Sequence, residues 1–139
     1  MSVQDLTTGN GTSTTVSILI VDDERDMRLL VRTVLARAGI QVVGEAEDGA
    51  EALSKVQELD PPPVPTVILL DNRMPGLRGL DVAVQILERA PDQLIILFSA
   101  FLDDQTVAEA KAFGVTACVS KKDVFALPEI IRMLVAPTS

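Results

Sequence analysis

Five short apolar runs alternate with five stretches of helical periodicity along this chain of 139 residues. The runs are rich in aliphatic and β-branched side chains and have the length of strands rather than of buried helices. They are Val16–Val21, Ile40–Gly44, Thr66–Leu70, Leu94–Phe98 and Thr116–Val119. Such alternation is typical of a parallel sheet whose right-handed crossovers place helices on both faces. The sequence therefore predicts a doubly wound α/β domain.

Apolar side chains spaced by three and four residues predict the helices between these strands. Gly39 and Gly114 follow two of the periodic stretches and predict where those helices end. The predicted helices are Met27–Ala38, Asp48–Leu59, Gly79–Ala90, Asp103–Phe113 and Val124–Val135.

Two segments fall outside this alternation. Residues 1–15 are rich in Thr, Ser and Gly and lack apolar periodicity, so we expect a disordered N-terminal tail. Residues 61–65 contain four prolines and predict a stiff, extended connector before the third strand. We therefore expect one folded domain over residues 16–136.

Composition narrows the function. The net charge of −8 argues against a nucleic-acid-binding surface, which needs patches of Lys and Arg. The absence of His excludes Ser-His triads and histidine metal sites within the chain, and the single cysteine, Cys118, cannot form an internal disulfide. No apolar run reaches membrane-spanning length and no signal peptide opens the chain, so we expect a cytoplasmic protein.

Charged residues stand where three of the predicted strands end. Asp22 and Asp23 follow the first strand, Asp71 follows the third, and Lys121 follows the fifth. A parallel sheet brings the carboxyl ends of its strands to one edge, where ligands bind. Clustered carboxylates repel one another unless a cation neutralises them, and hard oxygen ligands suit Mg²⁺. With a lysine to hold a phosphoryl group, the pattern indicates a metal-assisted phosphoryl site on a carboxylate.

At these residues the chain resembles the CheY-like receiver domain of bacterial two-component response regulators. The resemblance covers about Ser17 to Val135. Its motifs, each at a strand end, are Val21-Asp22-Asp23-Glu24, Asp71-Asn72-Arg73-Met74-Pro75-Gly76, Ser99-Ala100 and Lys121. It implies a flavodoxin-like, five-stranded parallel sheet of order 2-1-3-4-5 with five helices.

The resemblance also implies roles for these residues. Asp71 would be the phosphoacceptor, attacking phosphorus to form an aspartyl phosphate. Asp23 would bind Mg²⁺ directly, Asp22 mainly through water, and the backbone carbonyl of Arg73 would be a further ligand. Lys121 and the Ser99 hydroxyl would neutralise and hold the phosphoryl oxygens.

The switch region departs from the family pattern. Receiver domains usually carry Tyr or Phe three residues before the lysine, where this chain has Cys118. An aromatic rotamer switch is therefore unavailable at this position. The predicted switch region consists of Cys118 together with Ser99, Ala100 and Phe101. Phe101 either adds bulk near the switch or packs as core. Lys122 should be solvated, because successive strand side chains alternate between faces.

The expected function is a phosphorylation-activated switch rather than an enzyme with its own substrate. A histidine kinase or phosphotransfer protein would donate the phosphoryl group. A downstream protein would read the result on the face of helix four, strand five and helix five, without nucleic acid or membrane contact by this domain.

Several alternatives stay open. The chain could be the receiver part of a longer DNA-binding regulator. A phosphatase-like enzyme of the haloacid dehalogenase type needs a second acid two residues after the nucleophile, where Arg73 stands. A flavodoxin-like electron carrier would need a phosphate loop and aromatic residues that are missing. A docking module that is never phosphorylated would not need the four-part site.

Overall fold

The structure is a computed structural model, and it describes residues 16–59 and 65–136. Five parallel strands form one sheet, in the order β3-β2-β4-β5-β6. In order of appearance this is 2-1-3-4-5, as predicted. The strands are β2 (Ser17–Val21), β3 (Gln41–Ala46), β4 (Val67–Leu70), β5 (Leu94–Ser99) and β6 (Ala117–Ser120). The predicted N-terminal tail and all but Pro65 of the predicted connector lie outside the described residues.

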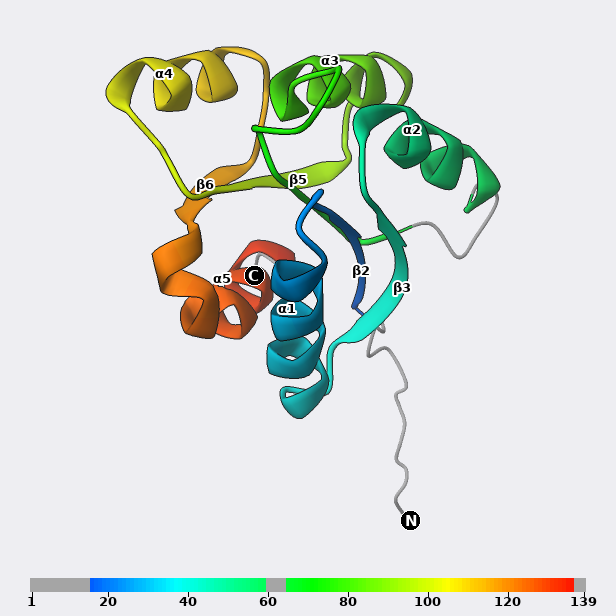
Figure 1. Ribbon diagram of the computed structural model, residues 1–139, viewed down its shortest axis with the longest axis vertical. Coiled ribbons are helices and arrows are strands. Elements are labelled where there is room, and N and C mark those ends of the chain that lie inside the picture. The colour runs from blue at the N-terminus through cyan, green and yellow to red at the C-terminus, as the bar shows by residue number, and fades with distance from the viewer. Residues whose placement is uncertain (1–15, 60–64, 137–139) are drawn as a thin grey trace.

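Helices cover both faces of the sheet, with α1 and α5 on one side and α2, α3 and α4 on the other (Figure 1). A 3₁₀ segment, η1, joins β6 to the last helix. The helical elements are α1 (Arg25–Arg37), α2 (Gly49–Glu58), α3 (Gly79–Arg89), α4 (Asp104–Ala112), η1 (Lys121–Ala126) and α5 (Leu127–Val135). The doubly wound architecture predicted from the alternating pattern is confirmed.

Alternating strand side chains build the two halves of the core. In β2, Leu19 and Val21 pack with α2 and α3 residues, whereas Ile18 and Ile20 pack with α1 and α5 residues. This follows from the two-residue repeat of a strand, which sends neighbouring side chains to opposite faces. The central strands are buried on both faces, so their apolar runs are unbroken.

Local signals set several helix boundaries. Asp48 accepts a hydrogen bond from the Glu51 backbone at the start of α2, and Asp103 accepts one from the Thr106 backbone at the start of α4. Gly39 and Gly114, with φ of 76° and 92°, adopt the left-handed conformation just after α1 and α4.

Most boundaries lie within one or two residues of those predicted, and two of the differences concern β3 and the last helix. β3 runs to Ala46 rather than ending at Gly44, because its last residues pair with β2 up to Val21. The last helical stretch begins with the 3₁₀ turns of η1 at Lys121, before the predicted start at Val124. That early start turns the chain back directly after β6, at the carboxyl edge of the sheet.

Candidate functional site

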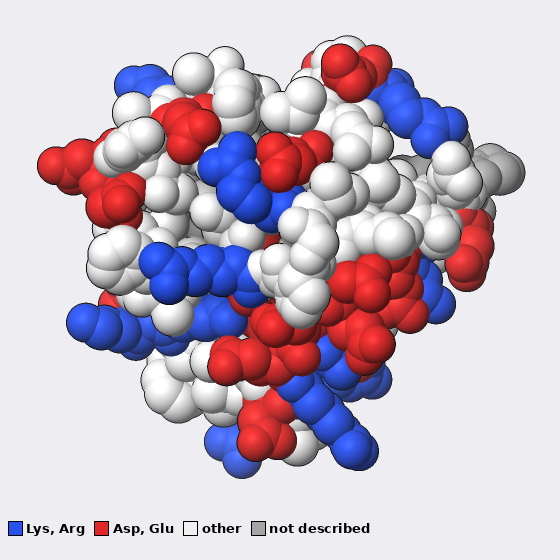
Figure 2. Space-filling model, turned by 45° about the horizontal axis from the view of Figure 1, so that its top comes forward, with Lys and Arg blue, Asp and Glu red and all other residues white. Residues whose placement is uncertain are grey.

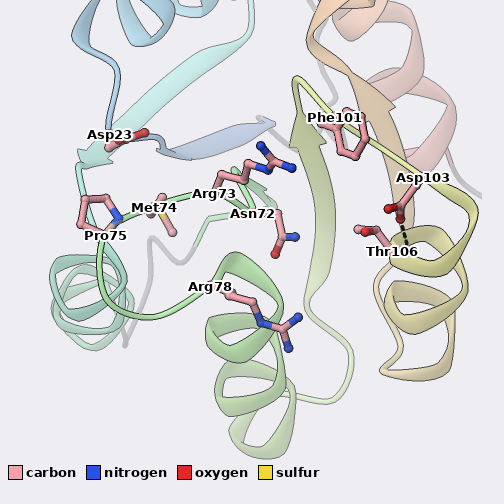
Figure 3. A pocket seen from close by; sticks show the side chains of 9 residues that line it. All are labelled: Asp23, Asn72, Arg73, Met74, Pro75, Arg78, Phe101, Asp103 and Thr106. Atoms are coloured by element: carbon pink, nitrogen blue, oxygen red, sulfur yellow. Dashed lines mark hydrogen bonds between the residues drawn. The ribbon is translucent and has the colours of Figure 1, made fainter.

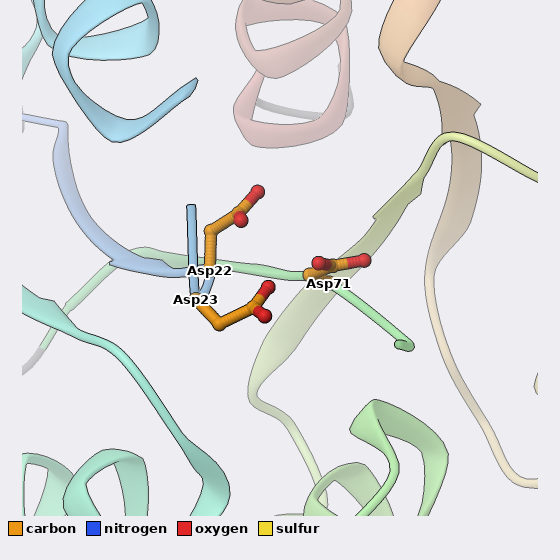
Figure 4. Close-up of side chains that lie close together, drawn as sticks. All are labelled: Asp22, Asp23 and Asp71. Carbon is orange, nitrogen blue, oxygen red and sulfur yellow. The ribbon is translucent and has the colours of Figure 1, made fainter. Parts of the chain in front are cut away.

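Three carboxylates from two strand ends meet at the carboxyl edge of the sheet. Asp22 and Asp23 follow β2 and Asp71 follows β4, and these two strands are neighbours in the sheet. One oxygen from each of the three lies within 4.8 Å of the others. Asp23 points toward Asp71 (Figure 4). Asp22 and Asp71 are buried, whereas Asp23 is exposed, so the cluster opens to solvent on the Asp23 side.

Lys121 reaches this cluster from the end of β6. Its Nζ lies 2.8 Å from Asp22 Oδ2 and 3.2 Å from Asp71 Oδ2. A third carboxylate, from the exposed side chain of Glu24, lies 3.3 Å away. The lysine is itself buried, so its ammonium group is the cation that neutralises the two buried aspartates within the part of the chain described.

The pKa values show how these charges balance. Burial raises the pKa of Asp71; Lys121 opposes the shift, and the negative charge of Asp22 adds to it. Burial also disfavours the charged form of Lys121, but its bonds and attraction to Asp22 and Asp71 outweigh burial and raise its pKa. The lysine therefore remains an ammonium group near neutral pH. The ionised form of Asp71, by contrast, lowers the stability of the folded protein.

Backbone hydrogen bonds orient two of the carboxylates. Asp22 Oδ1 accepts from the backbone of Glu24 at 2.8 Å, and Asp71 Oδ1 accepts from the backbone of Arg73 at 3.2 Å. Within the described residues, no hydrogen bond to the Asp23 carboxylate is found, which leaves its oxygens accessible. A cluster of hard oxygen donors with one accessible carboxylate fits Mg²⁺, which binds few protein ligands and keeps several waters.

Three of the four predicted switch residues, Ser99, Ala100 and Phe101, lie at the end of β5 or just after it. Ser99 is buried, and its hydroxyl donates to the Phe101 carbonyl (3.3 Å) and accepts from the Phe101 amide (3.4 Å). Phe101 is 55% exposed, so it does not pack as core. The Arg73 guanidinium lies over its ring, 4.9 Å from the centroid, beside an open pocket of about 570 Å³ (Figure 3). Ala100 is exposed.

Cys118 and Lys122 flank Lys121 along the chain. Cys118 is partly buried and packs against the half of the core that lies under α3, and burial raises the pKa of its thiol. Its side chain therefore stays a small apolar group. Lys122 is exposed, as predicted, but both lysines lie in η1 rather than in a strand, so strand alternation is not the reason.

Four residues around the site were not assigned roles from sequence. Glu24 contacts Lys121, and the Asn72 side chain accepts from the Leu80 backbone at the start of α3. Gly79 lies so close to the loop after β4 that an added Cβ would stand 2.1 Å from the Asp71 carbonyl oxygen. Arg28 donates to the Asp22 carbonyl. Asn72 and Glu24 stand inside the recognised motifs, but no local pattern marks Arg28 or Gly79.

The surface around the site is strongly charged. Asp and Glu side chains gather in a band on the face shown in Figure 2, and Lys and Arg side chains lie to both sides of it. Among the described residues, no helix combines the length and apolar character needed to span a membrane.

Comparison with known proteins places this geometry in a family. The family model described as the response regulator receiver domain matches residues 18–134. The chemotaxis protein CheY of Thermotoga maritima is 36% identical over 97 residues, which cover 70% of this chain and 78% of that protein. Response regulator protein VraR of Staphylococcus aureus is 32% identical over 108 residues, covering 77% of this chain but half of VraR.

A solved structure agrees in fold. Response regulator protein TrrA of Thermotoga maritima, in complex with Mg²⁺-BeF, superposes with a TM-score of 0.75 at 30% identity, covering 86% of this chain and 99% of that one. The sheet order and these matches show that the chain belongs to the response regulator receiver domain family, whose members are generally non-enzymatic domains of phosphorylation-based signalling.

Proposed function

We propose that this chain is switched by phosphorylation of Asp71. The observation that carries the proposal is the contact of Lys121 with both Asp22 and Asp71 at the open edge of a buried acidic cluster. That arrangement holds a carboxylate nucleophile beside a cation suited to an incoming phosphoryl group. A histidine kinase or phosphotransfer protein, which we expect to share the cytoplasm with this chain, would be the donor.

The proposed reaction is a transfer between two nucleophiles. A carboxylate oxygen of Asp71 attacks phosphorus, and a new P–O bond forms as the P–N bond to the donor histidine breaks. The electron pair of that bond stays on the histidine nitrogen, and Asp71 becomes an acyl phosphate. In the loose transition state, charge spreads over the equatorial phosphoryl oxygens, so positioning and neutralisation carry most of the catalysis.

The chain's own residues supply that neutralisation in part. Lys121 already bonds Asp71 and would follow the transferred group. Ser99 would give up its hydrogen bonds to Phe101 and donate to a phosphoryl oxygen. Asp23, Asp71, the Arg73 carbonyl and, through water, Asp22 would hold Mg²⁺. Bound there, Mg²⁺ would offset the negative charge of the phosphoryl group.

The signal would leave through protein contact on the face made by α4, β6, η1 and α5. Phe125 in η1 is 76% exposed and Val107 in α4 is 40% exposed, which gives this face apolar side chains for a partner.

The match with VraR, of which this chain spans half, favours a second candidate: a receiver joined to a separate output domain. Determining the intact mass of the protein isolated from its source would distinguish the two.

Small-donor phosphorylation tests the proposal. With acetyl phosphate and Mg²⁺, intact-mass analysis should show one added phosphoryl group that hydroxylamine removes, as expected of an acyl phosphate. Asp71→Asn should abolish the adduct, whereas Asp92→Asn, a change at an exposed loop residue, should preserve it. An adduct that persists in Asp71→Asn would remove Asp71 as the phosphoacceptor.

A further inference from the structure

The side chain of Arg28 links three elements beside the acidic cluster. It projects from the first turns of α1, and only 14% of it is exposed. Its Nε donates to Glu45 Oε1 in β3 at 3.0 Å, and its Nη1 donates to the carbonyl of Asp22, after β2, at 2.5 Å. One guanidinium thus joins α1, β3 and the loop that carries Asp22 and Asp23.

This contact completes the hold on the Asp22 backbone. The Asp22 amide donates to the Ala46 carbonyl of β3 at 3.0 Å. Its carbonyl accepts from Arg28, which is bound to Glu45 of the same strand. Both polar groups of the Asp22 peptide backbone are therefore tied to β3. With the backbone held on both sides, the directions in which the Asp22 and Asp23 side chains leave the loop are set.

Arg32 offers an internal comparison. One turn along α1, its Nη1 donates to the other oxygen of Glu45 at 2.7 Å. Its side chain is 50% exposed, and its described bonds do not reach Asp22. The two arginines therefore share one carboxylate, but only Arg28 extends the connection to the acidic loop.

We propose that Arg28 is a positioning residue for the metal site, which it serves by holding the Asp22–Asp23 loop against β3. The inference rests on the proposed Mg²⁺ site. A planar guanidinium can bind a carboxylate and a carbonyl at once in fixed directions, which a lysine ammonium cannot reproduce. Outer partners of this kind orient metal ligands without touching the metal.

Electrostatics and geometry predict opposite signs for the loss of Arg28. A positive charge near the cluster repels a cation, so removing it would by charge alone tighten Mg²⁺ binding. Loss of the backbone hold would let the loop carboxylates separate and would weaken binding. A weaker Mg²⁺ complex in a variant that lacks this charge can therefore be assigned to lost positioning.

Titration of Mg²⁺ by calorimetry or NMR shifts tests this in the full chain. Arg28→Gln should weaken Mg²⁺ binding about tenfold, the low end for loss of an outer-shell partner. Arg32→Gln, which removes a bond to the same Glu45, should stay within about twofold of the unmodified chain. The proposal would be overturned if Arg28→Gln bound Mg²⁺ as well as, or better than, the unmodified chain. It would also be overturned if Arg32→Gln weakened Mg²⁺ binding to the same extent as Arg28→Gln. If Arg28→Gln does not fold, Arg28→Lys takes its place under the same criteria.

Amide hydrogen exchange in metal-free protein gives a second readout. The Glu24 amide, which donates to Asp22 Oδ1, should exchange faster in Arg28→Gln than in Arg32→Gln at matched global stability. Equal exchange in both variants would count against positioning even where the affinities differ. If the unmodified chain binds no Mg²⁺, or Asp23→Asn binds it equally well, the proposed metal site fails, and the exchange comparison still decides whether Arg28 holds the loop.

Discussion

The Nζ of Lys121 lies 3.2 Å from Oδ2 of Asp71, although fifty residues separate the two along the chain. Both side chains are buried, at 9% and 4% exposure for the whole residues. The ammonium group also contacts Asp22, so one lysine offsets two buried carboxylates. The stability of the metal-free protein and the proposed reactivity of Asp71 therefore depend on the same ion pair.

Removing the lysine charge should make stability depend on metal. Lys121→Met leaves Asp22 and Asp71 buried without a cation, and the free energy of unfolding should fall by roughly 3–5 kcal/mol without Mg²⁺. Added Mg²⁺ should restore part of the loss. Urea denaturation with and without Mg²⁺ measures both effects. Lys122→Met, at an exposed position, is the matched control and should change stability by no more than about 0.5 kcal/mol. A loss that Mg²⁺ leaves unchanged would contradict this account.

The raised pKa of Asp71 predicts a pH dependence. Because the pKa of Asp71 is higher in the folded protein than in the unfolded chain, the protonated form of Asp71 stabilises the fold. That stabilisation is lost as pH rises from the ordinary pKa of 3.8 through the raised pKa of the folded protein. Asp71→Asn removes this loss. The variant should therefore gain stability over the unmodified chain as pH rises, because burial penalises the charged carboxylate of Asp71 and not a neutral amide.

Denaturation curves for the two proteins between about pH 4 and pH 8 test this dependence. The stability difference should widen with rising pH and then level off. A difference that is constant across the range would mean that the buried Asp71 carboxylate carries no excess free energy.

Gly79 should be required for close packing behind Asp71, the proposed phosphoacceptor. A Cβ there would stand 2.1 Å from the Asp71 carbonyl oxygen and 2.8 Å from the Asn72 Cα, both backbone atoms that cannot rotate away. Gly79→Ala should therefore lower the free energy of unfolding by about 2–3 kcal/mol, the upper range for overpacking. It should also weaken Mg²⁺ binding, because the loop bearing Asp71 must shift.

Gly44→Ala is a suitable comparison for Gly79→Ala. Its added Cβ would meet only Cδ1 of Leu19, at 3.2 Å, and that side chain can adjust. We expect a change below about 1 kcal/mol in urea denaturation. Similar losses in the two alanine variants would show that the contact with the Asp71 backbone is not decisive.

Phosphorylation should act mainly on the loop between β5 and α4. The new acceptor oxygens and negative charge would draw Ser99 from its bonds to Phe101. Hydrogen exchange compared between free and phosphorylated protein should therefore change most over residues 100–104, with little change at Cys118. Changes confined to Cys118 and α5, with the β5–α4 loop silent, would exclude this route.

Enlarging the side chain at position 118 separates the output from the chemistry. Cys118 packs against the core and makes no described hydrogen bond to Asp71 or Lys121. Cys118→Tyr should therefore change the affinity for a downstream partner more than the rate of phosphorylation by acetyl phosphate. A large loss of phosphorylation rate in a folded variant would place Cys118 on the chemical path.

The sequence by itself determined the alternation of strands and helices and the positions of the chemically important residues. Period-two and period-3.6 patterns are local, and they suffice to locate the elements. Acids and a lysine directly after strand-length runs were then expected at one edge of the sheet, because parallel strands end there together. Lys122 is exposed as the sequence predicted, although it lies in the 3₁₀ turns of η1 rather than in a strand.

Only the tertiary structure decided which side chains touch. Glu24 as a partner of Lys121, the packing of Gly79 on Asp71, the Arg73–Phe101 stacking and the extension of β3 arise between segments that no shared period links. Arg28 shows the reason most clearly: it is an ordinary charged residue of an amphipathic helix until folding brings the Asp22 carbonyl and Glu45 within its reach. Such contacts depend on how elements pack in three dimensions, and local periodicity carries no record of them.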